Sequence, residues 1–387
     1  MRSSTKLLGL GTALAVAASL GLPVVSAQAD VGPSAGDIVG IGSDTVQNIA
    51  NFLGDGDPTG SSNGINSVGG RNRFVSFDAT PDANDRAGYT VTGAVLNPTI
   101  ILRGGTNPVQ RPNGSSSGLA AMLKDTVAPY KINWVRMSRF TKTAEYTTAQ
   151  NAGFGGLHVV KASTDALKIA AATTTNAPAA LTATQLVDIY KCATTARTWN
   201  QVGGTSTNSI IPQIPQGGSG TGDTFRADLQ AANGGTAVTL GSCVLTVQEN
   251  DPTSITTSTS SPGVSASADT IAPFSEGRLN LFNNGYFKDP AVTYGNPPTT
   301  LNAGIQMLNG TGAYVNNRGL YFVFRESGMT STVPFQAGGA LNFARSLFAN
   351  PGGATSPYLN TPDGRSAVVA AGGAAAYVDC GVNPATC

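Results

Sequence analysis

Charged side chains are scarce in this sequence, and their scarcity excludes several classes of protein. Only 12% of the 387 residues are charged, and the 23 basic and 22 acidic side chains nearly cancel. No long-range field therefore draws the chain toward nucleic acid or acidic membranes. The aromatic residues are too few and too scattered to predict a platform for stacking carbohydrate. The 48 glycines fit an exported chain that neutral polar groups keep solvated.

Cysteine and histidine are also rare, with four cysteines, one histidine and no C-x-x-C pair. This disfavours a zinc site, and we expect neither a metal nor a cofactor. In an exported chain an even number of cysteines favours disulfides, and four cysteines allow three connectivities. We prefer Cys192–Cys243 and Cys380–Cys387, because each pair closes a loop within one region. His158 is expected to lie at the surface or to be satisfied by its neighbours.

Long apolar runs are missing beyond the N-terminus, where Arg2 and Lys6 precede an apolar stretch that ends in Ala27-Gln28-Ala29. This is the pattern of a secretory signal peptide, residues 1–29, with cleavage before Asp30. A membrane anchor is the alternative, but it needs about 20 continuous apolar residues, and the glycines and the cleavage pattern disfavour it. No cysteine lies near the cleavage point, which excludes the usual bacterial lipid attachment. We expect a secreted, extracellular chain.

The remaining chain, 387 − 29 = 358 residues, is long enough for two lobes of roughly 150 residues each. Short β-type runs alternate with helical patterns, which predicts an α/β fold with mainly parallel sheets covered by helices. The expected strands are residues 37–43, 73–79, 98–105, 131–139, 155–162, 208–216, 268–275 and 319–327. The expected helices are residues 45–54, 117–125, 182–191, 222–230 and 340–350.

Three polar stretches of low complexity interrupt this pattern, at residues 54–70, 173–180 and 251–269. The last of them cannot form a packed element of its own and is expected to be a surface loop or a connection between lobes. No internal repeat of fixed period is evident.

Glycines and hydroxyl side chains gather at three predicted strand-to-helix junctions: "GIGSDTVQN" (40–48), "RPNGSSSGLAAM" (111–122) and "GGSGTGDTF" (217–225). Ligands of open α/β sheets lie beyond the carboxyl ends of the strands, where helix N-termini gather. Helix N-termini offer unpaired N–H groups and a partial positive charge, so the three junctions together predict a site for one small oxyanion. Arg136 and Arg139, in "NWVRMSRF", could add bidentate contacts.

Each junction also has a simpler explanation. Ser and Thr before a helix are ordinary N-caps, and "GSG" is typical of flexible loops. Arg136 and Arg139 lie an odd number of residues apart in a predicted strand, so at most one of them should face a given site. It is the coincidence of three such junctions that favours binding.

The same motifs carry a resemblance. The order "GSDT", "PNGSSSG" with "INWVRMSR", "LTATQLVDIYKCATTARTWNQVGG" and "IIPQIPQGGSGTGDTF" resembles the phosphate-binding proteins of phosphate ABC transporters. The similarity runs from about Asp37 to Phe225, with a weaker match over Asp269–Arg278. It implies a type II periplasmic-binding-protein-like fold, in which two α/β lobes close over one phosphate. The resemblance assigns ligand contacts to Thr45, Ser116, Ser219, Gly220 and Thr221.

Three departures from that family matter. Its members place an aspartate, which accepts the proton of hydrogen phosphate, where this chain has Ser138, and an arginine where this chain has Pro215. Asp44 could replace the acceptor, and Arg136 or Arg139 the charge. Without an acceptor the site would lose its physical reason for excluding sulfate. The missing lipid-attachment cysteine leaves open whether the chain is released, held otherwise, or used for capture or sensing instead of uptake.

Two other functions compete with binding. "GSSSG" fits the G-x-S-x-G pattern of serine hydrolases, with Ser116, Asp125 and His158 as the candidate triad. However, Ser116 follows "RPN" and no uninterrupted strand, and Asp125 lies at the end of the same predicted helix. An adhesive or structural exported protein is the second alternative, and it would gain no stability from a small anion.

We therefore expect a non-enzymatic, monomeric solute-binding protein that captures an oxyanion, most simply phosphate, for an ABC transporter permease. One lobe would comprise about residues 37–150 and 270–387, and the other about 151–269, within a single domain of residues 30–387. The expected ligand-binding residues are Ser43, Asp44, Thr45, Ser115, Ser116, Ser117, Arg136, Ser138, Arg139, Ser219, Gly220 and Thr221.

Overall fold

The computed structural model describes residues 32–57, 60–67, 72–80, 99–283, 304–330, 347–348 and 357–387. The expected signal peptide and most of the expected helix at 340–350 lie outside the described residues. None of the helices in the described ranges has the length and apolar character needed to span a bilayer.

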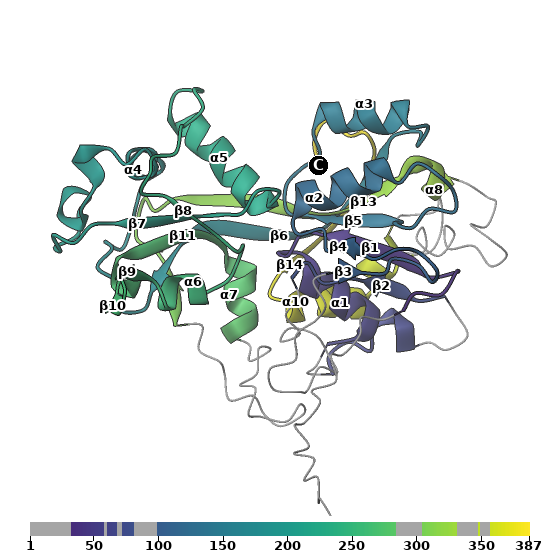
Figure 1. The fold of residues 1–387 in the computed structure, drawn as a ribbon. Coiled ribbons are helices and arrows are strands. Elements are labelled where there is room, and N and C mark those ends of the chain that lie inside the picture. The colour runs from purple at the N-terminus through teal and green to yellow at the C-terminus, as the bar shows by residue number, and fades with distance from the viewer. Residues whose placement is uncertain are drawn as a thin grey trace, which may run out of the picture.

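One large sheet forms the centre of the molecule, and helices cover both of its faces (Figure 1). Its strand order is β2-β1-β5-β13-β6-β11-β7-β8, with β12 and β14 also paired to β6. The strands of this sheet are β1 (Ile38–Gly42), β2 (Phe74–Ser76), β5 (Trp134–Met137), β6 (Leu157–Ala172), β7 (Ile211–Pro215), β8 (Leu245–Val247), β11 (Thr270–Ser275), β12 (Ile305–Met307), β13 (Val315–Arg325) and β14 (Ala374–Val382). Two small hairpins are β3 (Thr99–Ile100) with β4 (Val109–Gln110), and β9 (Thr259–Ser261) with β10 (Val264–Ser265).

The two ends of the sheet are parallel, and its centre is antiparallel. At one end β1 pairs in parallel with β2 and β5, and at the other end β7 pairs in parallel with β8 and β11. Between them β6 and β13 run antiparallel to each other over most of their length. These two long strands therefore tie the halves of the sheet together, as β6 shows in Figure 1.

The helices on the two faces are α1 (Gln47–Asp55), α2 (Ser115–Lys124), α3 (Thr143–Asn151), α4 (Ala183–Tyr190), α5 (Gly220–Ala232), α6 (Thr253–Thr256), α7 (Glu276–Asn283), α8 (Glu326–Thr330) and α10 (Pro362–Ala370). Three apolar clusters fill the space between helices and sheet. Strand β13 contributes apolar side chains to the cores on both faces of the sheet. Phe322 and Phe324 lie in one cluster, and Tyr321 and Val323 lie in another. A strand that is buried on both faces is apolar throughout, which explains the run "LYFVF".

The expected strands and helices that fall within the described ranges are present. The structure adds elements that were not predicted, among them α3, α7, α10, β8, β12 and β14, and two of the predicted segments differ from expectation. Strand β6 continues ten residues beyond the predicted 155–162, through "STDALKIAAA". The expected loop at 251–269 contains helix α6, the β9–β10 hairpin and a 3₁₀ turn at Ser267–Asp269. In both segments pairing with distant or adjacent strands overrides a weak local propensity.

The structure contains both preferred disulfides. Cys192, just after α4, is bonded to Cys243, just before β8. Cys380 in β14 is bonded to Cys387 at the end of the chain.

Candidate functional site

The three predicted junctions meet in space. Ser43–Thr45 follow β1, Ser115 begins α2, and Ser219 caps α5. The Thr45 and Thr221 hydroxyl oxygens lie 3.2 Å apart although the residues are 176 positions apart in sequence. Because β1 and β7 stand at opposite parallel ends of the sheet, this contact joins the two halves of the molecule.

Serine hydroxyls continue the same group. The Ser43 hydroxyl donates to Ser138 Oγ at 3.1 Å, and Ser115 Oγ lies 3.3 Å from the same atom. The Ser138 N–H donates to Ser115 Oγ at 2.9 Å. We call this group, with two further residues described below, the inner cluster: Ser43, Thr45, Ser115, Ser138, Gly220, Thr221 and Glu249.

Gly220 allows the halves to approach this closely. A methyl group at this position would collide with the hydroxyl oxygens of Ser115 and Ser138. The neighbouring loops also touch, since the Ser116 N–H donates to the Gly218 carbonyl at 3.0 Å. Small residues at the start of α5 are therefore needed for packing, whatever they bind.

Helix α5 directs its N-terminus at the inner cluster. Ser219 is its N-cap, and the Ser219 side chain accepts a hydrogen bond from the Gly222 N–H at 2.9 Å. The first N–H groups of a 13-residue helix carry a partial positive charge, which favours an anion at this point.

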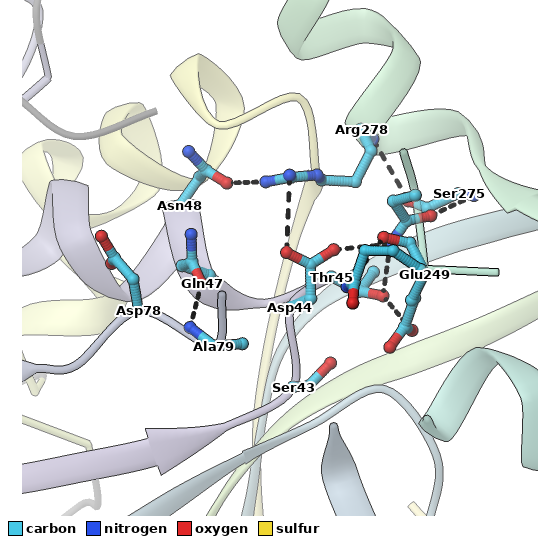
Figure 2. Close-up of polar contacts among 12 residues, drawn as sticks. Ser43, Asp44, Thr45, Gln47, Asn48, Asp78, Ala79, Glu249, Ser275 and Arg278 are labelled. Atoms are coloured by element: carbon cyan, nitrogen blue, oxygen red, sulfur yellow. Dashed lines mark hydrogen bonds and ion pairs between the residues drawn. The ribbon is translucent and has the colours of Figure 1, made fainter. Parts of the chain in front are cut away.

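The structure places at this point a carboxylate that was not predicted from the sequence. Glu249 follows β8, is 2% exposed, and accepts hydrogen bonds from the Thr45 hydroxyl at 2.8 Å and from the Thr221 N–H at 3.3 Å. Figure 2 shows the Glu249 side chain against Thr45. Its second oxygen, Oε2, has no hydrogen-bond partner among the described residues. The available signal was a polar "QEN" directly after the apolar "VLTV", which is the carboxyl end of a parallel strand.

Asp44, the expected proton acceptor, is engaged elsewhere. Its carboxylate lies 3.5 Å from Arg278 Nη2 and accepts from Asn250 Nδ2 at 3.2 Å. Arg278 also donates to Asn48 of α1, so Asn48, Arg278 and Asp44 form a buried row beside Thr45 (Figure 2). In this arrangement Asp44 pairs with an arginine, and Glu249 is the carboxylate that reaches the hydroxyls.

Arg136 holds the backbone together instead of facing the inner cluster. Its guanidinium is fully buried and donates to Ser76 Oγ at 2.7 Å and to the carbonyls of Ser43 and Phe77 at 3.0 and 2.7 Å. These bonds fix the loop after β1 and the end of β2. The expectation that at most one of the two arginines shares a site is consistent with this geometry.

Ser116 and Arg139 belong to a second group, which we call the outer cluster: Ser116, Arg139, Glu145 and Asp223. The Ser116 hydroxyl donates to Asp223 at 2.7 Å, and Arg139 donates to Ser116 at 2.8 Å. Arg139 also pairs with Glu145 at 2.5 Å and with Asp223 at 3.0 Å. The charge of Arg139 is therefore balanced by two carboxylates. Ser117 is half-buried beside Gly218, outside both clusters.

The structure does not assemble the candidate hydrolase triad. Both ring nitrogens of His158 are occupied, by Glu326 at 2.8 Å and by Asp379 at 2.7 Å. Asp125 accepts from the backbone N–H groups of Lys131 and Ile132. Since Ser116 binds Asp223 and Arg139, none of the three residues contacts another in the described part of the chain.

No family model matches the sequence, and no curated protein matches it either. Among solved structures, a candidate phosphate ABC transporter substrate-binding protein with bound phosphate from Clostridium perfringens matches at 14% identity and a TM-score of 0.51. The match covers 88% of this chain and 99% of the other. An ABC-type phosphate transport receptor from Vibrio cholerae matches at 14% identity and a TM-score of 0.48, over 88% of this chain and 100% of that one. The fold assignment rests on the first match: the chain is similar in fold to a substrate-binding protein, and it has the α/β fold that the sequence predicted.

Proposed function

We propose that this chain is an exported solute-binding protein that captures an inorganic oxyanion, most simply phosphate, at the inner cluster. The observation that carries the proposal is the meeting of Thr45 and Thr221, from opposite ends of the sheet, at the N-terminus of α5. The fold likeness to a protein solved with bound phosphate supports it.

The donors of the proposed site are neutral. Hydroxyls of Thr45, Ser138 and Thr221 and the N–H groups at the start of α5 would contact the oxyanion, and the helix dipole would supply the favourable field. The described arginines nearest to this group are engaged with carbonyls or carboxylates. Oxyanions bind well to such preoriented neutral donors, because each hydrogen bond is charge-assisted.

In this proposal the ligand lies between two lobes of one monomeric chain. Strand β11 lies between β6 and β7 and pairs with β7, so we extend the second lobe from about residue 151 through α7, to about residue 283. Residues 37–150 would belong to the first lobe, and β6 and β13 would connect the two lobes. An ABC permease would receive the anion, and a signal peptide that is cleaved before Asp30 would direct export.

One observation favours an alternative, an exported protein that keeps this fold without anion uptake. Glu249 already accepts hydrogen bonds from two of the proposed donors. The alternative predicts that no small oxyanion binds at all.

Calorimetric titration of the mature, anion-stripped chain with phosphate, and then with sulfate at matched ionic strength, tests the proposal. We expect phosphate to bind, and Thr221→Val to weaken binding by about 10- to 100-fold, since a hydrogen bond to a charged group contributes about 1.5–3 kcal/mol.

Thr147→Val is the matched control for this titration. Thr147 is exposed on α3, and its hydroxyl binds the Thr143 carbonyl of its own helix, so this variant should bind like the wild type. Equal affinities in the wild type and Thr221→Val would contradict the placement of the site.

A further inference from the structure

Glu249 sits where the proposed anion would need to bind. We propose that its carboxylate is an internal competitor that occupies the anion site, so that a free oxyanion binds only by displacing it. This inference rests on the proposed function, and it concerns how that site is regulated.

The two donors that Glu249 takes cannot serve a second acceptor equally well. Thr45 has one O–H group and Thr221 has one N–H group, and both point at Glu249 Oε1, at 2.8 and 3.3 Å. The chain's own carboxylate thus holds the same kinds of hydrogen bond that a phosphate oxygen would accept at a helix start.

The segment that carries Glu249 is fixed to all three junctions. Gln248 accepts from Asn113 Nδ2 at 2.8 Å, near the start of α2. The Glu249 N–H donates to the Gln216 side chain at 2.7 Å, just before α5. Asn250 donates to Thr45 at 3.0 Å, after β1. We call Gln248–Asn250 the latch segment, because three consecutive side chains bridge the two halves of the molecule.

Charge explains why the competitor must leave before an anion binds. The carboxylate of Asp44 lies nearby, bridged to Thr45 through Asn250, and Arg278 pairs with it. Among the described residues no cation pairs with Glu249. Its side chain accepts from a hydroxyl and an N–H group, and its Oε2 is buried without a partner there. An oxyanion placed beside a second buried anion would be repelled, and the repulsion is strong where water is excluded.

Displacement would transfer the donors from Glu249 to the ligand. Binding would then release the middle residue of the latch segment from Thr45 and Thr221. The measured affinity would reflect the difference between the free energies with which the oxyanion and the Glu249 carboxylate bind the same donors. Because the competition depends on charge and not on a proton of the ligand, it should weaken phosphate and sulfate binding alike.

The test is calorimetric titration of the wild type, Glu249→Gln and Glu249→Ala with phosphate and with sulfate. Glutamine keeps the shape of the side chain and removes its charge, and alanine removes the competitor altogether. We expect both variants to bind both anions about tenfold or more tightly than the wild type does. Thermal unfolding of each variant establishes that it is folded.

Glu276→Gln is the matched control, because it removes the same charge from a carboxylate that pairs with Lys168 at 2.6 Å and not with Thr45. Its anion affinity should equal that of the wild type. If the wild type binds phosphate and Glu249→Gln binds it equally or more weakly, the proposal that Glu249 competes with the ligand is overturned, while the proposed function stands. If no variant binds any oxyanion, both the proposed function and the competitor are overturned.

Discussion

At the residue scale, His158 connects three elements through its ring. Nδ1 lies 2.8 Å from Glu326 of α8, and Nε2 lies 2.7 Å from Asp379 of β14, while His158 itself is in β6. Burial alone would lower the pKa of His158, but the hydrogen bonds to Asp379 and Glu326 and the charges of these residues raise it above its usual value of 6.5. Only the protonated ring can donate from both nitrogens at once.

The direction of this pKa shift predicts how stability changes with pH. A raised native pKa adds stability that is fully present below the unfolded pKa of about 6.5 and is lost as the pH rises through the native pKa. We expect His158→Gln to lower the free energy of unfolding at pH 6 by about 1–3 kcal/mol, and by less at pH 9. Urea unfolding at both values measures this, and an equal loss at the two pH values would show that the ring acts only by packing.

Some residues of the site could be predicted from the sequence, and the partners of others could not. Hydroxyls at strand-to-helix junctions are local features, so the meeting of Ser43, Thr45, Ser115 and Thr221 could be expected from the topology of α/β sheets. The partner of a charged side chain is not local. Arg136 is satisfied by carbonyls about 60 and 90 residues away, and nothing in the sequence distinguishes it from a ligand-binding arginine.

At the element scale, the parallel ends of the sheet were easier to predict than its antiparallel centre. Strands β1, β7 and β11 are short apolar runs bounded by turn residues, which is a local signal. The second half of β6 contains Ser163, Asp165 and several alanines, and it is a strand because β11, β12 and β13 pair with it from positions more than a hundred residues away. The short β8 was also missed, although it pairs with the nearby strand β7, and with it Glu249.

The lengths of the loops that the two disulfides close predict how much each disulfide contributes to the free energy of unfolding. Cys192–Cys243 joins the end of α4 to the approach to β8 and spans 51 residues, whereas Cys380–Cys387 spans 7. Loop-closure entropy predicts a loss of about 4 kcal/mol when both cysteines of the longer loop become alanine, against about 2 kcal/mol for the shorter loop.

Urea unfolding of the two double variants, Cys192→Ala with Cys243→Ala and Cys380→Ala with Cys387→Ala, compares them directly. Each pair serves as the control for the other. A larger loss from the seven-residue loop would show that native-state packing at the C-terminus outweighs chain entropy.

At the scale of the whole molecule, the inner cluster lies where the two halves of the sheet present their loops to each other. The Thr45–Thr221 contact, the Asn113–Gln248 hydrogen bond and the latch segment all cross this boundary. Two long antiparallel strands, β6 and β13, carry the chain between the halves. A ligand at this boundary would therefore act on the stability of the entire fold, because it would touch both halves at once.

Thermal unfolding measures this coupling. At a hundredfold excess over Kd, bound phosphate should stabilise the wild type by about 2.7 kcal/mol and raise its Tm by roughly 4 °C.

The loss of Glu249 should change the Tm both without and with phosphate. Without phosphate, Glu249→Ala should unfold at a lower temperature than the wild type, because Thr45 and the Thr221 N–H lose their shared acceptor.

With phosphate at one fixed concentration, Glu249→Ala should gain more in Tm than the wild type, because its affinity is higher and no internal anion has to be displaced. Sodium chloride at the same ionic strength is the control for screening of surface charge, and Thr221→Val should show the smallest gain. A phosphate-induced gain that is equal in all three proteins would mean that the anion acts elsewhere on the surface. A gain in none of them would leave Glu249 as a purely structural link between the two halves of the molecule.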